Sequence, residues 1–301
     1  SIVNLLQMQK GEKVAAMICV EDFDQPVSLV LCTRNGVVKK THLSAYRNHR
    51  KGGLIGINVD EGDKVIEARK TNGENHLLLL THKGKGLRFN ETQLRNQGRV
   101  TRGVRGIRLR EGDYVESMLV VDDERLLLIA GNNGLGIRTE FSAFLPRGGE
   151  GEDITPRKRG GYGVIAMDAK ALAGALAVEQ DDEIMMLTKK GQAIRCPVHN
   201  IRSTNRGTKG VKLVNLGKGD KLVAISRVIM MQEDELAEGD EKSEADDDSI
   251  NEGESQTDGP SEEPKSQVGE GEEINPMEEE PSSSEENLGE GDDSETDPNN
   301  S

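Results

Sequence analysis

The sequence predicts an all-β fold, a propeller-like array of repeated four-stranded blades followed by a disordered acidic tail. A Gly-acid-x-Val/Leu phrase begins at Gly11, Gly62, Gly112 and Gly219, with spacings of 51, 50 and 107 residues, the last being two periods with an insertion. Short apolar runs, each closed by a glycine, keep the same period. A repeat of about 50 residues with several short strands is typical of propeller blades, whose sheets bury their faces against their neighbours.

Each repeat is predicted to contain a β-hairpin. The apolar runs cover residues 27–32, 77–80, 126–130 and 184–187. A turn glycine follows each run, with a basic residue four positions later: Gly36 with Lys40, Gly84 with Arg88, Gly134 with Arg138, and Gly191 with Arg195. The Asn-Gly pairs at 35–36 and 133–134 supply the positive φ that tight hairpin turns need. We therefore expect three or four short strands in each period.

The ends of the array and one alanine-rich segment need separate interpretation. Residues 2–6 are interpreted as the last strand of a preceding blade, and residues 221–228 as a closing strand. The chain starts inside an apolar run without an initiator Met, which suggests a fragment of a longer protein. Residues 168–178 are rich in alanine and would suit a helix by propensity, but their place in the repeat predicts a strand. The prediction is about four full blades plus these flanking strands.

Charge divides the chain into a basic part and an acidic part. Residues 231–301 hold 28 of the 54 acidic residues but only Lys242 and Lys265 of the 39 basic ones, a net charge of −26, which leaves +11 on residues 1–230. The acidic segment has too few apolar residues to offset the entropy of ordering. We therefore predict a β domain at 1–230 and a disordered tail at 231–301. A basic body favours nucleic acid as a ligand, because Lys and Arg neutralise phosphates.

Four glycine-rich basic loops recur at one phase of the repeat, at residues 47–53, 99–106, 157–163 and 202–210. In a propeller they would lie at equivalent places and line a continuous cationic track, which suits the backbone of a bent duplex. The absence of tryptophan and the 2% of aromatic residues argue against a stacking platform for single strands. The other interpretation is that the loops only turn corners and their charges are solvated. The candidate DNA-binding residues are Arg47, Arg50, Lys51, Arg99, Arg102, Arg105, Arg157, Lys158, Arg159, Arg206 and Lys209.

Catalytic and cofactor motifs are missing from the sequence. It has no Walker loop, HExxH pair or GxSxG elbow, and its five histidines are scattered. The pairs Asp122-Asp123 and Asp181-Asp182 are interpreted as solvated turn residues, and Cys19, Cys32 and Cys196 as reduced core residues without metal-ligand spacing. We expect no catalytic residue, cofactor or metal in this chain. Without an apolar run long enough to span a bilayer or a signal segment, the expected location is cytoplasmic.

Several phrases resemble the carboxy-terminal DNA-wrapping domain of bacterial DNA gyrase A. They are Ile2-Val3-Asn4-Leu5-Leu6, Asn35-Gly36-Val37-Val38-Lys39-Lys40-Thr41, Thr101-Arg102-Gly103-Val104-Arg105-Gly106-Ile107-Arg108-Leu109 and Asp182-Glu183-Ile184-Met185-Met186. The resemblance runs from Ile2 to about Val228. It implies a β-pinwheel, a propeller-like array whose blades exchange strands. The family's Gln-Arg-Arg-Gly-Gly-Lys-Gly box would lie upstream of Ser1, and residues 49–53 and 157–163 look like degenerate copies of it.

The resemblance also implies a function and partners. The expected role is to bind, bend and wrap double-stranded DNA within an ATP-dependent type II topoisomerase, supporting negative supercoiling near the nucleoid. The expected partners are the amino-terminal part of the same polypeptide and a separate ATPase chain, which would use ATP and Mg. Two alternatives stay open: the equivalent domain of topoisomerase IV, and a propeller that serves as a protein-interaction scaffold. The acidic tail is either an electrostatic mimic of DNA that contacts the basic loops or a solubilising extension.

Overall fold

The computed structural model describes residues 11–48, 52–146 and 155–228. The chain divides into two compact units, Ser1–Ala237 and Glu238–Ser301, and every described residue lies in the first unit. The strand expected at 2–6, the candidate residues Arg50 and Lys51, and the acidic tail lie outside the described residues. The boundary at residue 230 between a β domain and a tail stays a prediction.

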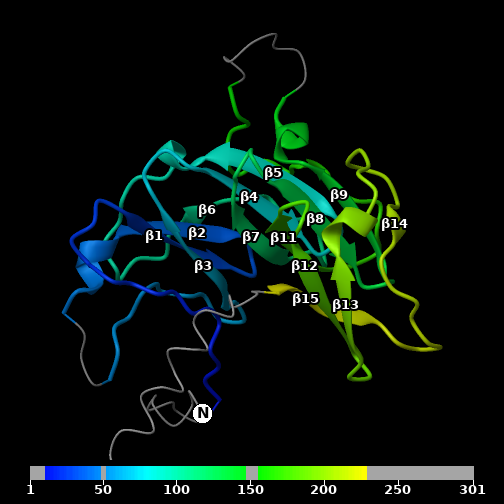
Figure 1. Ribbon diagram of the computed structural model, residues 1–301. Helices are drawn as coiled ribbons and strands as arrows, with labels where there is room; N and C mark the ends of the chain where they lie inside the picture. Colours follow the sequence, from blue (N-terminus) through cyan, green and yellow to red (C-terminus); the bar gives the residue numbers. More distant parts are fainter. Residues whose placement is uncertain (1–10, 49–51, 147–154, 229–301) are drawn as a thin grey trace, which may run out of the picture. The chain divides into compact units, whose positions relative to one another are not determined.

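The described residues form the predicted all-β repeat, with four antiparallel sheets in chain order (Figure 1). The first sheet has the order β3-β1-β2-β6, from β1 (Ser28–Thr33), β2 (Val37–His42), β3 (Val65–Thr71) and β6 (Val104–Arg105). The second has the order β10-β5-β4-β7, from β4 (His76–Thr81), β5 (Lys85–Asn90), β7 (Val115–Val120) and β10 (Val164–Ile165). The third has the order β11-β8-β9-β14, from β8 (Leu126–Gly131), β9 (Leu135–Glu140), β11 (Leu172–Val178) and β14 (Val211–Lys212). The fourth has the order β13-β12-β15, from β12 (Glu183–Thr188), β13 (Ala193–Pro197) and β15 (Leu222–Val228).

Short 3-10 turns follow the second strand of each hairpin, at η2 (Leu43–Tyr46), η3 (Glu91–Gln93), η4 (Phe141–Phe144) and η5 (Val198–Asn200). The alanine-rich segment contains strand β11, and the closing segment contains strand β15, so both predicted strands are confirmed. Among the residues described, no helix has the length and apolar character needed to cross a bilayer.

Neighbouring repeats exchange strands. The two-residue outer strand of each of the first three sheets comes from the repeat that follows: β6 pairs with β2, β10 with β5, and β14 with β9. The fourth sheet has three strands in the described part of the chain. The number of full blades in the whole chain stays a prediction, because part of the chain lies outside the described residues. A sheet built by this exchange takes its outer strand from the next repeat.

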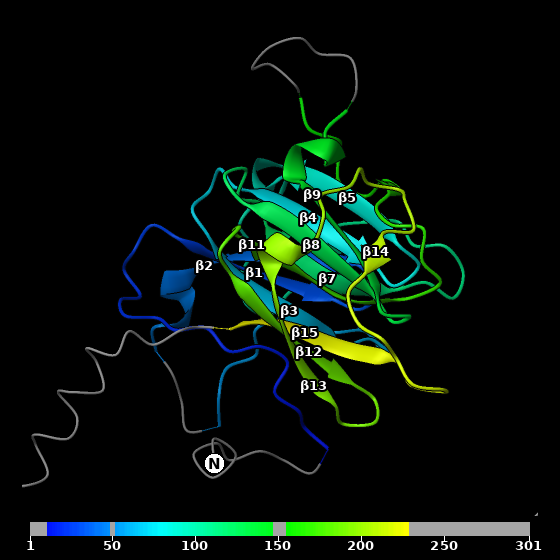
Figure 2. The same ribbon diagram turned by 45° about the vertical axis from the view of Figure 1, so that its right-hand side comes forward.

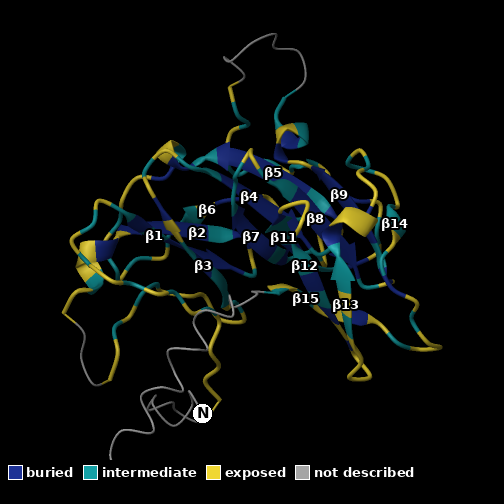
Figure 3. Cartoon of the chain, viewed as in Figure 1, coloured by how far each residue is buried: buried dark blue, intermediate teal, exposed yellow. Residues whose placement is uncertain are grey.

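The core lies between the sheets. The strands β3, β7, β11 and β15 contact one another in that order (Figures 1 and 2). Leu77, Leu78, Leu79 and Leu80 of β4 are all 0% exposed, because alternate side chains enter different clusters. Leu77 and Leu79 pack toward the first sheet, while Leu78 and Leu80 pack toward the third. Buried residues accordingly follow the hairpin strands of the first three sheets in Figure 3, whereas β13 of the fourth sheet has none. A strand buried on both faces reads as a continuous apolar run, which explains the runs in the sequence.

The Gly-acid phrase has a local role in three of the hairpins. The Oδ1 atoms of Asp63, Asp113 and Asp220 accept hydrogen bonds from the backbone N–H groups of Asn35, Lys83 and Lys190, at 2.9, 3.0 and 3.1 Å. Each aspartate therefore satisfies the turn of the hairpin in its own sheet. The repeated phrase found in the sequence is a turn-capping device.

One of the three cysteines predicted to lie in the core is exposed. Cys32 is buried in β1, and Cys196 is half-buried in β13, but Cys19 is exposed. The reason is that the apolar residues around Cys19 belong to residues 11–27, which form no strand.

Candidate nucleic-acid interface

The basic loops lead into the exchanged strands. Gly103, Gly163 and Gly210 come directly before β6, β10 and β14, with φ values of 83°, 68° and 81°. A Cβ atom at these positions would lie 2.6, 2.4 and 2.2 Å from the carbonyl oxygens of Val38, Gly86 and Gly136. Glycine is needed here for both reasons, the positive φ and the close approach of two backbones. The same glycines therefore fix where each loop ends.

Successive loops are joined through their backbones. The N–H of Asn58 donates to the carbonyl of Thr101 at 2.9 Å, that of Arg108 to Gly161 at 2.8 Å, and that of Asp168 to Thr208 at 2.9 Å. The acceptor in each case lies two residues before the positive-φ glycine of its loop. The structure thus brings the second, third and fourth basic loops into one connected series, each attached to the repeat before it.

Three of the predicted residues, Arg105, Lys158 and Lys209, are exposed cations that form no ion pair within the described residues. Arg102 has 70% of its side chain exposed and pairs with Asp60 at 2.5 Å. Arg47 pairs with Asp24, both side chains being more than half exposed. An exposed pair of this kind contributes little to stability, so phosphate can compete for either arginine.

Two predicted arginines hold the loops in place. The guanidinium of Arg159 donates to the carbonyls of Gln93 and Arg105, each at 3.0 Å. That of Arg206 donates to Ala143 and Ile165 at 2.6 and 3.0 Å. Both residues lie four positions before their loop glycine and contact the preceding repeat in the same way. They therefore position the loop backbone, a role that the sequence does not distinguish from that of the exposed cations.

Arg99 and Arg157 are half-buried. The carbonyl of Arg99 accepts a hydrogen bond from the Nζ of Lys39, and the carbonyl of Arg157 accepts one from Gln93 at 3.2 Å. The Nε of Arg157 is buried without a hydrogen-bond partner. Both residues connect their loops to the preceding repeat through the backbone.

Further exposed cations lie in or beside these loops but are not among the candidate residues predicted from the sequence. They are Arg95, Arg108, Arg110, Arg202 and Lys212. Arg108 and Arg110 face the ring of Tyr162 in the next loop, with guanidinium-to-centroid distances of 5.3 and 5.9 Å. Position within the repeat could have identified two of these residues, because Arg95 and Arg202 both lie eight residues before the glycine of their loop.

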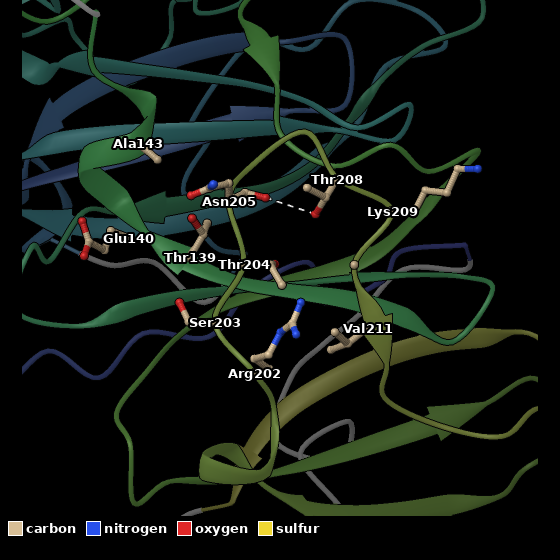
Figure 4. A pocket seen from close by; sticks show the side chains of 11 residues that line it. Thr139, Glu140, Ala143, Arg202, Ser203, Thr204, Asn205, Thr208, Lys209 and Val211 are labelled. Atoms are coloured by element: carbon tan, nitrogen blue, oxygen red, sulfur yellow. Dashed lines mark hydrogen bonds between the residues drawn. The ribbon is translucent and has the colours of Figure 1, made fainter.

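The fourth loop encloses a polar cleft of about 660 Å³ against β9 and η4 (Figure 4). Hydroxyl groups line it from Thr139, Ser203, Thr204 and Thr208, and Arg202 contributes a cation. The Oγ1 of Thr204 is buried without a hydrogen-bond partner. Glu140 adds one carboxylate to the wall. Hydroxyl and guanidinium donors are groups that bind phosphate oxygens.

The basic residues four positions after each turn glycine have a different role. Lys40 is 6% exposed and pairs with the fully buried Glu91 at 2.7 Å. Arg88 is 3% exposed and binds both carboxylate oxygens of Asp123, at 2.7 and 2.6 Å. Arg138 is 7% exposed and donates to Gln180 at 2.7 Å. These three cations are structural. Arg195 is exposed and pairs with Glu183.

The acidic pairs are consequently more than solvated turns. Asp123 is the ion-pair partner of Arg88, and Asp182 accepts the backbone N–H of Glu179 at 2.8 Å and lies 3.6 Å from Arg227. Asp123 is solvated as interpreted, with 55% of its side chain exposed. The interpretation was wrong for Asp182, whose side chain is 17% exposed, because its turn lies beside Arg227 of β15. Within the described ranges, no group of three or more His, Cys, Asp or Glu residues could hold a metal ion.

One histidine shares the site of Arg88. The Nε of Arg88 donates to Nδ1 of His76 at 2.9 Å. Burial, and next the Arg88 charge, lower the pKa of His76 below its usual value. The neutral imidazole is the form that accepts this hydrogen bond.

Fold and loops together define a class, a propeller-like repeat domain with exchanged outer strands and a connected series of solvent-facing cationic loops. The chain belongs to the family described as DNA gyrase C-terminal domain, beta-propeller, which it matches over residues 28–72, 75–122, 125–171 and 182–229.

Curated relatives are DNA gyrase A subunits. The chain is 39% identical over 243 residues to that of Mycolicibacterium smegmatis strain ATCC 700084, covering 79% of this chain and 27% of the relative. It is 38% identical over 239 residues to that of Chlamydia muridarum, covering 77% and 28%. The chain thus spans about a quarter of the length of the relatives it matches.

Solved structures share the fold. The C-terminal domain of DNA topoisomerase IV aligns with a TM-score of 0.69 and 26% identity, over 81% of this chain and 75% of that one. A DNA gyrase A C-terminal domain aligns with a TM-score of 0.64 and 27% identity, over 76% and 74%. The expected β-pinwheel is therefore confirmed.

Proposed function

We propose that this chain binds, bends and wraps double-stranded DNA as a module of DNA gyrase A. The observation that carries the proposal is the connected series of basic loops, in which exposed cations recur at each strand exchange along a fold shared with gyrase A. Cations spaced along a path bind phosphates without reading bases. Bending a site of two or three turns costs on the order of 1 to 6 kcal/mol, which many weak phosphate contacts together can offset.

The proposed DNA-binding residues fall into two roles. Arg102, Arg105, Lys158 and Lys209, with Arg47, contact phosphates. Arg99, Arg157, Arg159 and Arg206 hold the loops at the spacing that the phosphates require. Arg50 and Lys51 of the first loop stay candidates for phosphate contact.

The holoenzyme supplies the remaining activities. We propose that the amino-terminal part of the same polypeptide cleaves DNA, that a separate ATPase chain uses ATP and Mg, and that the wrapped duplex supports negative supercoiling. This chain contributes no cofactor site in the proposal. The location that follows is cytoplasmic, at the nucleoid. Topoisomerase IV is the second candidate, favoured by the structural similarity above, whereas the curated relatives favour gyrase.

The test is a topology assay. Relaxed circular duplex is incubated with the full chain, then treated with a nicking-closing topoisomerase, and the topoisomers are separated. Wrapping shifts the distribution, whereas binding without a shift would restrict the proposal to bending. Absence of duplex binding at low salt would contradict it and favour the protein-interaction scaffold.

The acidic tail has its own experiment. We propose that its charge of −26 competes with DNA for the loops. Deleting the residues after Gln232 then raises duplex affinity at low salt, whereas an unchanged affinity leaves the tail a solubilising extension.

A further inference from the structure

The second and third loop junctions are closed by a glycine N–H. Gly160 donates to the carbonyl of Gly106 at 2.6 Å, and Gly207 donates to the carbonyl of Ala166 at 2.7 Å. Gly160 and Gly207 have φ values of 77° and 81°, and both lie three residues before the glycine that begins the exchanged strand. The same hydrogen bond therefore ties the third and the fourth loop to the repeat before it.

The first junction lacks this glycine. Val100 lies three residues before Gly103, in the position of Gly160 and Gly207, and a β-branched residue is strongly disfavoured at a φ near +80°. Val100 is 60% exposed, and in the described part of the chain its N–H makes no hydrogen bond to Gly56. Gly56 occupies the acceptor position, three residues after Gly53, as Gly106 follows Gly103.

A lysine side chain takes the place of the missing donor. The Nζ of Lys39 donates to the carbonyl of Gly56 in the first loop segment and to the carbonyl of Arg99 in the second loop. Lys39 is 0% exposed. A buried amine is costly unless its hydrogen bonds are made, and these two carbonyls accept two of them.

Strand register identifies the equivalent residues in the other sheets. Lys39 pairs across the hairpin with Leu31, as Leu87 pairs with Leu79 and Ile137 with Ile129. Where the core residue is apolar, at Leu87 and Ile137, the loop at that junction has the donor glycine. Where the core residue is Lys39, the loop has Val100. Both positions therefore differ at the first junction, where the amine of Lys39 replaces the N–H donor that Val100 does not provide.

We propose that Lys39 is a positioning residue of the DNA-binding surface, whose buried amine joins the first and second basic loops at the junction where the glycine N–H is missing. The role in DNA binding rests on the proposed function. The loop junction itself does not, because it can be measured without DNA. An ammonium has three N–H donors and a neutral amine has two, so both hydrogen bonds persist in either protonation state.

The experiment compares Lys39→Leu, Val100→Gly and the double variant in the full chain. The first readout is hydrogen exchange at the amide of Asn58, which donates to Thr101 across this junction. Lys39→Leu is expected to accelerate exchange at Asn58 about tenfold or more, since two partly buried carbonyls lose their partner. The amides of Arg108 and Asp168, at the other two junctions, stay unchanged and serve as internal controls. The double variant restores protection, because a glycine at 100 can supply the backbone donor.

Duplex affinity is the second readout. Lys39→Leu is expected to weaken binding about tenfold, and the double variant to return to within about twofold of the native chain. Leu87→Met, at the equivalent position of the second sheet, is the matched control and leaves affinity unchanged. A structural loss unrelated to the junction would not be rescued by Val100→Gly.

The outcomes separate the two proposals. Accelerated exchange at Asn58 with rescue, but no duplex binding by any protein, would keep the junction and overturn the proposed function. Unchanged exchange in Lys39→Leu, or no rescue by Val100→Gly, would overturn the role of Lys39. If Lys39→Leu does not fold, Lys39→Met carries the same comparison, and failure of both to fold would contradict a role confined to the junction.

Discussion

Basic side chains of this domain have two different roles that look alike in the sequence. Arg105, Lys158 and Lys209 face solvent on the loops, whereas Lys39, Lys40 and Arg88 are buried among carbonyls and carboxylates. Burial of a cation requires a partner brought close by the fold, and here the partner comes from another segment, as Asp123 does for Arg88. The regular spacing of the basic residues after each turn glycine was visible in the sequence. Their partners were not, because strand exchange decides which segments meet.

Glu91 is a buried residue whose loss should be costly. Its carboxylate pairs with Lys40 and accepts hydrogen bonds from Thr71, Gly73 and Asn75. Glu91→Ala leaves Lys40 buried without a partner and is expected to lower the free energy of unfolding by about 3–5 kcal/mol. Urea denaturation measures it. The exposed Glu74→Ala is the control, expected within about 0.5 kcal/mol of the native chain, and an equal effect of both would refute the assignment.

The contribution of Lys39 to the free energy of unfolding should change with pH above neutral pH. Burial, and then the nearby Arg99 charge, lower the pKa of Lys39 to about 8 from its ordinary value of 10.5. Between these values the unfolded chain binds more protons, so the contribution of Lys39 to stability rises with pH and is lost as pH falls toward 8. Urea unfolding of the native chain and Lys39→Leu at pH 7.5 and 9.5 measures the difference. The native chain should be more stable relative to Lys39→Leu at pH 9.5 than at pH 7.5.

Two neighbours bear on that comparison. Arg99 is present in both proteins. Tyr46, whose pKa is raised mainly by burial, is present in both proteins and cancels. A stability difference that stays constant with pH would contradict a buried, titrating Lys39.

The elements owe their arrangement to the exchanged outer strands. A two-residue strand buries little area on its own, and its attachment depends on the loop glycine that lets two backbones meet. The repeated phrases in the sequence predicted the hairpins and the closing strand β15. They could not show that each blade is completed by the next repeat, which only the family resemblance suggested.

Two glycines at the same phase of the repeat should respond differently to alanine. Gly163→Ala combines a φ of 68° with a Cβ at 2.4 Å from the carbonyl oxygen of Gly86. It is expected to destabilise the chain by about 2–4 kcal/mol and to release β10, raising hydrogen exchange at Ala166. Gly53 has a φ of 75° but nothing within 4 Å of the added Cβ. Gly53→Ala is expected to cost about 1 kcal/mol, and equal costs would disprove the effect of close backbone approach.

At the scale of the whole molecule, the proposed function depends on loops from several repeats acting on one duplex. The composition and the recurrence of basic loops predicted this surface from the sequence. The division of the loop arginines into solvent-facing residues, proposed to bind phosphate, and residues that hold the loops needed the structure. Arg159 and Arg206 match Arg105 in residue type and in loop context. Only the carbonyls of the preceding repeat distinguish them.

Phosphate binding by the loops is tested most directly by the duplex affinity of the full chain across a salt series. Arg105, Lys158 and Lys209 are replaced together by alanine, and the control replaces Lys70, Lys189 and Lys221, exposed lysines outside the loops. Each lost phosphate contact lowers the slope of log K against log salt by about 0.9. We expect a slope reduced by about 2–3 in the loop variant and unchanged in the control. Equal effects of the two triple substitutions, or none in the loop variant, would contradict phosphate binding by these loops.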